Sequence, residues 1–227
     1  MRETWRRWHV WLGWISGVPL LLWSLSGLVM ASRPLAEIRS DMYLQPVAVK
    51  PGAYVGPTLV GPDVKAVELV TGPAGPRWQV RLKDGEARAL DASTGQIAPR
   101  LTAAQAAAAA IGGYKARENV RSVTFVGHAE RTHEQPIDVD SWRVEFADGM
   151  RIYIDAWSGK VLVARSAWWT VYDKAWAIHI MDLQGRDDPN NPWIIMLGLL
   201  TTALVVLALG LLPKATRQLL RPPAPAE

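Results

Sequence analysis

Two long apolar segments near the two ends of the chain constrain its fold more than any other feature. Residues 10–31 and 193–212 contain no Asp, Glu, Lys or Arg. A helix needs about 20 apolar residues to cross a hydrocarbon core of roughly 30 Å. The sequence therefore predicts two transmembrane helices, one within residues 1–31 and one over residues 191–213.

Basic residues flank both apolar segments on their outer sides. Cytoplasmic ends of membrane helices are enriched in Lys and Arg, so both termini are expected in the cytoplasm and residues 32–190 on the opposite side. The first apolar segment exceeds the 7 to 15 residues of a signal peptide, which favours an uncleaved anchor. The flanking residues are Arg2, Arg6 and Arg7 before the first segment, and Lys214, Arg217 and Arg221 in the tail, 214–227.

Charge and cysteine content exclude several classes of function. The net charge is +4, but the basic residues form no run with interleaved aromatic residues, so no nucleic-acid partner is expected. The chain has no cysteine, which excludes disulfides, thiolate catalysis, covalent haem attachment and cysteine-ligated iron–sulfur clusters.

An internal repeat occupies the middle of the chain. The pattern of residues 78–97 recurs at 142–161, with an offset of 64 positions that carries Trp78 onto Trp142 and Asp91 onto Asp155. Each copy alternates apolar and polar residues, has an Asp-Gly pair (84–85 and 148–149), and ends in a turn at glycine. The repeat therefore predicts two antiparallel β units.

A helix is predicted only in the second unit. Residues 101–111 form an alanine-rich segment that Thr102 is suited to cap, and residues 120–126 read as a strand. The expected fold class is α+β, with a linker over 32–64, a degenerate first unit over 65–100 and a second unit over 101–165.

The segment between the repeats and the second apolar segment, 166–190, is expected to hold an interfacial helix and a loop. Residues 168–181 place Trp168, Tyr172, Trp176 and His179 on one helical stripe. The acidic and amide residues 187–191 offer oxygen atoms to a cation, but Asn191 as the cap of the next helix, with Pro192 at its first position, is the simpler interpretation.

At these repeats the chain resembles the PepSY family, whose modules begin with a helix like that at 101–106 and end with a strand and turn like 153–161. The segments 6–13, 26–28 and 176–179, together with Pro19, resemble the PepSY-associated transmembrane proteins. The resemblance covers most of the chain, although the first unit lacks the helix. It implies a bacterial inner-membrane protein with a periplasmic central domain.

The resemblance leaves two functions open. Larger relatives are described as iron-regulated membrane proteins, and some are ferric-siderophore reductases that carry electrons through b-type haems held by membrane histidines. Those proteins have four or more spans, whereas two are predicted here. PepSY modules also occur in protease propeptides and regulators, which implies a non-catalytic binding or regulatory protein as the alternative.

His9 and His179 match the family's membrane histidines, and neutral imidazole is a common haem ligand. The predicted topology places them at opposite faces of the membrane, so they cannot ligate one iron. Haem b would then need a homodimer or another membrane subunit to supply opposing ligands. The alternative is that both are ordinary interfacial histidines.

Two further patterns are weaker. Four potential metal ligands, His128, Glu130, His133 and Glu134, lie between two predicted strands, but their spacing fits no closed structural site and a polar loop explains them equally well. Gly13 and Gly17 form a Gly-x-x-x-Gly pair of the kind that lets membrane helices approach closely.

No complete enzyme is evident in the sequence. It lacks hydrolase, phosphate-binding and dinucleotide-binding motifs. A redox role would therefore make the chain one subunit of a membrane reductase, with its electrons supplied by another protein.

Overall fold

The computed structural model describes residues 2–45, 48–49, 51–57, 63–83, 87–116, 118–130, 132–135 and 139–219, without the side chains of 2–6, 8, 9, 41, 87 and 207–219. The chain divides into two compact units, each described by itself. Met1–Ser32 and Tyr172–Glu227 form what we call the helical unit, and Arg33–Val171 form the sheet unit. Helix α4 (Ala167–His179) begins in the sheet unit and ends in the helical unit.

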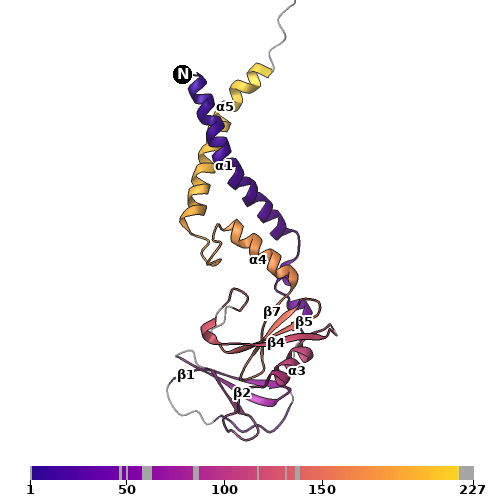
Figure 1. The fold of residues 1–227 in the computed structure, drawn as a ribbon. Helices are drawn as coiled ribbons and strands as arrows, with labels where there is room; N and C mark the ends of the chain where they lie inside the picture. The colour runs from indigo at the N-terminus through magenta and orange to yellow at the C-terminus, as the bar shows by residue number, and fades with distance from the viewer. Residues whose placement is uncertain are drawn as a thin grey trace, which may run out of the picture. The chain divides into compact units, whose positions relative to one another are not determined.

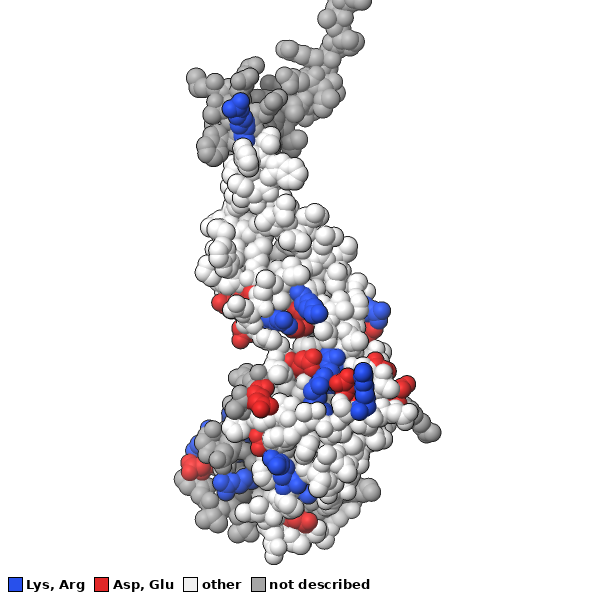
Figure 2. Space-filling view, viewed as in Figure 1, with Lys and Arg blue, Asp and Glu red and all other residues white. Residues whose placement is uncertain are grey.

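The helical unit contains α1 (Arg2–Ala31) and α5 (Pro192–Leu219), which pack against each other (Figure 1). Ser16 and Leu197 are buried, at 1% and 7% exposure. The Ser16 hydroxyl donates to the Leu12 carbonyl at 2.7 Å, so this buried polar group is satisfied within its own helix. On the face in view in Figure 2, the middle of the helical unit carries no charged side chain.

One helix is long and apolar enough to cross a membrane, as far as the described side chains reach. It is the segment Val10–Ala31 of α1, whose side chains are mostly exposed. The apolar part of α5 within the described side chains is Pro192–Val206, which is shorter. At 1.5 Å per residue this part reaches about 22 Å, less than a hydrocarbon core of roughly 30 Å. Among the described side chains, only the first of the two predicted spans therefore reaches membrane length.

The sheet unit is α+β, as predicted, and contains two antiparallel sheets. The first has the order β1-β2-β3 and the second the order β4-β5-β6-β7. Their strands are β1 (Val64–Gly72), β2 (Gly75–Leu82) and β3 (Ala87–Asp91) in the first, and β4 (Val120–Val126), β5 (Ser141–Phe146), β6 (Arg151–Asp155) and β7 (Val161–Arg165) in the second.

The predicted helix of the second unit is α3 (Ala103–Gly113), which packs on the second sheet. Thr102 and Gln105 form a reciprocal capping box, because each side chain accepts the backbone N–H of the other residue. Small alanines on the inner face let the helix lie close to the sheet. The core between them includes Leu101, Ala110, Val144, Phe146, Ile152 and Ile154, all at most 3% exposed.

The sequence repeat has the same turn in both copies. The carboxylate of Asp91 accepts two following backbone N–H groups at 2.7 and 3.1 Å, and that of Asp155 accepts the corresponding two at 2.9 and 2.7 Å. Each turn closes with a glycine at positive φ, 71° at Gly95 and 81° at Gly159. Glycine reaches this region without steric cost, which explains its recurrence.

The two copies also hold their preceding segments in the same way. The indole N–H of Trp78 donates to the Val55 carbonyl at 2.7 Å, and that of Trp142 to the Leu101 carbonyl at 3.0 Å. The N–H groups of Val55 and Leu101 in turn each donate at 2.8 Å to the alanine that follows the turn aspartate. The first copy therefore extends back to Val55, within the segment predicted to be a linker.

Buried polar groups join the two copies. Gln79 of β2 is 3% exposed and donates to the fully buried Asp155 carboxylate at 2.7 Å. Arg77 is 5% exposed and donates to the carbonyls of Pro99 and Trp157 at 2.8 and 2.7 Å. Since a buried polar group without partners is costly, these contacts fix how the first copy sits against the second.

Three smaller elements complete the description. They are α2 (Leu35–Ile38) and the 3₁₀ turns η1 (Asp41–Tyr43) and η2 (His128–Glu130). The Asp-Gly turn predicted at 84–85 lies outside the described residues. Its counterpart is confirmed, because Gly149 has φ of 83° and its N–H donates to the Phe146 carbonyl at 3.0 Å.

Candidate functional site

His179 is the last residue of α4, and its imidazole lies against α1 within the helical unit. Its Nδ1 atom is 3.1 Å from the Trp23 carbonyl oxygen and 3.2 Å from the Ser26 hydroxyl. The ring stacks on the Trp23 indole, with ring centres 4.6 Å apart and planes inclined by 20°. His9, the other predicted ligand, lies in α1, and its side chain is outside the described part of the structure.

These contacts determine the tautomer of His179. A carbonyl oxygen can only accept, so the contact with Trp23 requires a hydrogen on Nδ1. The Ser26 hydroxyl donates to the same carbonyl at 2.8 Å and is thus free to accept from the imidazole as well. In a neutral ring, Nε2 then carries a lone pair and no hydrogen, which is the form that ligates metals.

Gly27 lets the imidazole approach α1 this closely. A Cβ atom at this position would lie 3.1 Å from Cε1 of His179 and 3.4 Å from Nδ1. The first distance is shorter than ordinary van der Waals contact, and the second is at its lower limit. A side chain at position 27 would therefore push the imidazole away from its two hydrogen-bond partners.

The site lies inside the apolar segment of α1. Trp23 and Gly27 precede Ala31 by eight and four residues, which corresponds to about 12 and 6 Å along a helix. His9 precedes Trp23 by 14 residues, or about 21 Å. The His9 backbone is therefore far along α1 from Trp23, which the His179 imidazole contacts.

The loop after α4 is tied to the start of α5. The Asn191 side-chain amide donates to the Ile180 carbonyl at 2.6 Å, and its oxygen accepts the N–H groups of Trp193 and Ile194 at 3.1 and 3.3 Å. The predicted cap at Asn191 and first helical position at Pro192 are confirmed. Because Ile180 follows His179 directly, this cap also holds the end of α4 that carries the imidazole.

Asp182 organises the rest of this loop. Its carboxylate accepts the backbone N–H groups of Gly185, Asp187 and Asp188 at 2.8, 3.3 and 3.4 Å. Desolvation raises the pKa of Asp182, but these N–H groups outweigh it and hold the pKa below its ordinary value. Asp182 and Asp188, which accepts the Asn190 N–H at 2.9 Å, thus stabilise turns of the loop.

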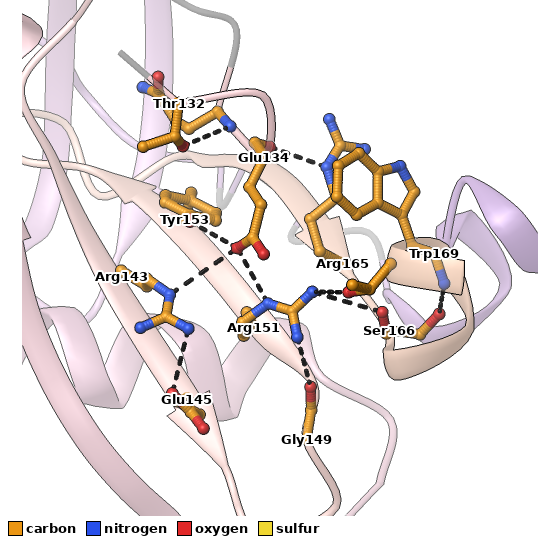
Figure 3. A network of polar contacts seen from close by, with 12 residues as sticks. Thr132, Glu134, Arg143, Glu145, Gly149, Arg151, Tyr153, Arg165, Ser166 and Trp169 are labelled. Carbon is orange, nitrogen blue, oxygen red and sulfur yellow. Dashed lines mark hydrogen bonds and ion pairs between the residues drawn. The ribbon is translucent and has the colours of Figure 1, made fainter. Parts of the chain in front are cut away.

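Two of the four predicted metal ligands, Glu134 and His128, make separate contacts, and Figure 3 shows those of Glu134. Glu134 accepts from Arg151 Nε and from the Tyr153 hydroxyl, both at 2.9 Å. His128 instead lies 3.1 Å from Asp140 through Nδ1. Among the described residues, no three His, Cys, Asp or Glu side chains are placed to hold a metal ion.

Glu134 is the centre of a network on the outer face of the second sheet. Arg143 Nε lies 3.9 Å from the same carboxylate oxygen, and Arg165 Nε donates to the Glu134 backbone carbonyl at 2.8 Å. Burial raises the pKa of Tyr153 to about 12, and the neighbouring Glu134 charge adds to the effect. The network fixes the 132–135 segment to the sheet.

The Gly-x-x-x-Gly pair does not form the contact with α5. Gly13 and Gly17 are exposed, and a Cβ at either position would meet no described atom within 4 Å. The buried small residue of this turn is Ser16. Among the described atoms, the glycine pair therefore makes no close contact with α5.

A groove of about 740 Å³ lies in the sheet unit. It is lined by residues 68–73, by α3, by 159–161 and by the segments 44–45 and 48–49. Successive side chains of a strand point to opposite faces, so lining by consecutive residues places the groove along the free edge of β1. The Glu68–Lys160 ion pair, at 2.6 Å, lies at this groove.

His179 could be predicted from the sequence as a candidate ligand, but its contacts with Trp23, Ser26 and Gly27 could not. Trp23, Ser26 and Gly27 have the i, i+3, i+4 spacing of one helix face, which is the signal that groups them. No family model, curated protein or solved structure matches the chain. The resemblance to PepSY proteins therefore remains a prediction, and the site is interpreted from its own geometry.

Proposed function

We propose that this chain is a two-pass inner-membrane protein whose His179 ligates haem b, and that it serves as a haem-bearing or accessory subunit in electron transfer across the membrane. The observation that carries the proposal is the hydrogen bond from Nδ1 of His179 to the Trp23 carbonyl. Metal-bound histidines commonly donate their second ring N–H to a carbonyl or carboxylate in this way.

If haem binds, His179 would hold its iron through Nε2, and Trp23 and Ser26 would orient the imidazole. Nε2 is unprotonated in the tautomer that the Trp23 carbonyl selects. Stacking on the Trp23 indole orients the imidazole ring, and because the Nε2 lone pair lies in the plane of that ring, the indole does not cover it. The hydrogen bond at Nδ1 makes the imidazole a stronger electron donor through Nε2. When bound, haem supplies one-electron transfer, and the protein supplies ligation, orientation and an apolar environment.

A second histidine ligand would have to come from outside this site. His9 is about 21 Å away along α1, so it cannot oppose His179 within one copy. A homodimer, or another membrane subunit, would bring a second imidazole to each level of the membrane. Ferric-siderophore iron is the acceptor that the PepSY resemblance implies, and a separate protein would deliver the electrons.

The two-pass topology belongs to this proposal. Helix α5 is 28 residues long, and residues 193–212 contain no charged side chain. Together with the basic residues beside both apolar segments, this supports cytoplasmic termini and a periplasmic sheet unit.

The proposal is tested by the reduced-minus-oxidised absorbance spectrum of the detergent-purified full chain made with ample haem. We expect b-type bands that are lost in His179→Ala. The matched control is His128→Ala, because His128 also has a bound Nδ1 but is exposed in the sheet unit; its spectrum should equal the wild type. A wild-type protein that is colourless, alone and with co-purifying partners, overturns the redox function.

The groove along β1 favours a second candidate, a membrane-anchored binding or regulatory protein without catalytic activity. An unpaired strand edge beside a hollow is a common feature of surfaces that bind other polypeptides. This candidate predicts a colourless protein whose cellular role survives His179→Ala. The same spectrum and a complementation assay of that variant therefore discriminate between the two functions.

A further inference from the structure

Two arginine–tryptophan stacks lie at the start of α4, within the sheet unit. The Arg33 guanidinium carbon is 4.7 Å from the centre of the Trp168 ring, and that of Arg165 is 4.4 Å from Trp169. Consecutive helical residues project about 100° apart, so the two stacks occupy adjacent sides of the first turn of α4. The first turn of α4 is thus flanked by cations on two sides.

Chain connectivity places the first of these stacks close to the end of α1. Arg33 is the second residue after Ala31, the last residue of the membrane-length segment. Consecutive Cα atoms are about 3.8 Å apart, so the Arg33 backbone lies within about 8 Å of that end, however the two units are oriented. If α1 spans the membrane, the Arg33 backbone is therefore close to the level of the lipid headgroups.

Stacking leaves Arg33 able to bind an anion. It uses the face of the guanidinium, whereas the N–H groups lie in the plane and point outward. One of them donates to Glu37, and the Arg33 side chain is still 48% exposed. Arg39 is also exposed and forms no ion pair with a side chain in the described residues. Arg33 and Glu37 balance each other in charge, so the exposed Arg39, six residues after Arg33 in the chain, gives the described residues 33–39 a net positive charge.

We propose that Arg33, supported by Trp168 and assisted by Arg39, binds the phosphate of anionic lipid headgroups on the exported side of the membrane. The planar guanidinium matches phosphate oxygens in geometry and charge. Positive surplus favours anionic over zwitterionic lipids. The site rests on the proposed membrane anchorage by α1 and is independent of haem.

The test is native mass spectrometry of the full chain released from micelles that contain equal amounts of phosphatidylglycerol and phosphatidylcholine. We expect wild type to retain phosphatidylglycerol preferentially, and Arg33→Ala to lower that preference about fivefold, as for the loss of one surface cation. The matched control is Arg100→Ala, because Arg100 stacks over Phe125 at 4.4 Å elsewhere in the sheet unit. This control should retain the wild-type preference.

An equal preference in Arg33→Ala and wild type overturns the lipid site. If the far-ultraviolet circular dichroism shows that Arg33→Ala does not fold, Glu37→Gln is used as the test variant. Removal of the Glu37 carboxylate, which competes for Arg33, should raise phosphatidylglycerol retention. An unchanged ratio in Glu37→Gln would overturn the site equally. If the protein is colourless but still selects phosphatidylglycerol, only the haem proposal is wrong. If carbonate extracts the chain from membranes, α1 is not a membrane anchor, and both the anchor and this lipid site are wrong.

Discussion

At the residue scale, Tyr153 makes the stability of the sheet unit depend on alkaline pH. Its side chain is 2% exposed and donates to Glu134, and its pKa is raised to about 12 by burial and by that carboxylate. In an unfolded chain, tyrosine ionises near pH 10. The native state therefore holds the Tyr153 proton more tightly than the unfolded state does. The resulting contribution to the free energy of unfolding is complete below about pH 10 and is lost as the pH rises toward 12.

This contribution is removable by one substitution. A pKa difference of about two units between the folded and unfolded states corresponds to at most roughly 3 kcal/mol in the free energy of unfolding. Between pH 10 and 12, we expect the free energy of unfolding of wild type to fall more steeply than that of Tyr153→Phe, measured by denaturant titration of the full chain in detergent. Parallel slopes for the two proteins would show that Tyr153 does not ionise in this range on unfolding.

At the element scale, the close approach of α4 to α1 depends on Gly27. The side chain in Gly27→Val would overlap with the His179 imidazole, whose Cε1 is 3.1 Å from the Cβ position. Overpacking of this kind costs about 1–3 kcal/mol. We expect Gly27→Val to lose most of the haem absorbance while its helical circular dichroism is retained.

Gly13→Val is the matched control, since it makes the same change in the same helix where no described atom lies within 4 Å of the Cβ position. Its haem content should equal that of wild type. Equal haem content in Gly27→Val and Gly13→Val would show that the α1–α4 contact does not position the ligand.

The elements that could be predicted from sequence are those with local signals. Helix α3 has a capping box and an alanine run, and β4 has the predicted bounds of 120–126. Strand β1 was missed because its hairpin turns through Gly72-Pro-Ala-Gly75, which lacks the Asn-Gly or Asp-Gly signal used to find the others. Strand β7 extends beyond the end of the repeat, because only its first pair, Ile154 with Val161, has a counterpart in the first unit, the bridge between Leu90 and Ile97.

At the scale of the whole molecule, the candidate site could be predicted only in part. His179 was identified by its resemblance to family histidines and its place on an amphipathic stripe. Its partner Ser26 is 153 residues away in the sequence, and no periodic pattern relates two helices separated by a complete sheet unit. The tautomer of the imidazole follows only from the tertiary contact with a backbone carbonyl, which leaves no trace in residue identities.

Haem ligation by the His179 imidazole can be tested by chemical rescue. His179→Gly removes the side chain but leaves Trp23 and Gly27 around the space it occupied. Titration of this variant with free imidazole, followed in the reduced-minus-oxidised spectrum, should restore b-type bands that are absent without imidazole. Bands in His179→Gly that equal those of wild type before any imidazole is added would contradict ligation by His179.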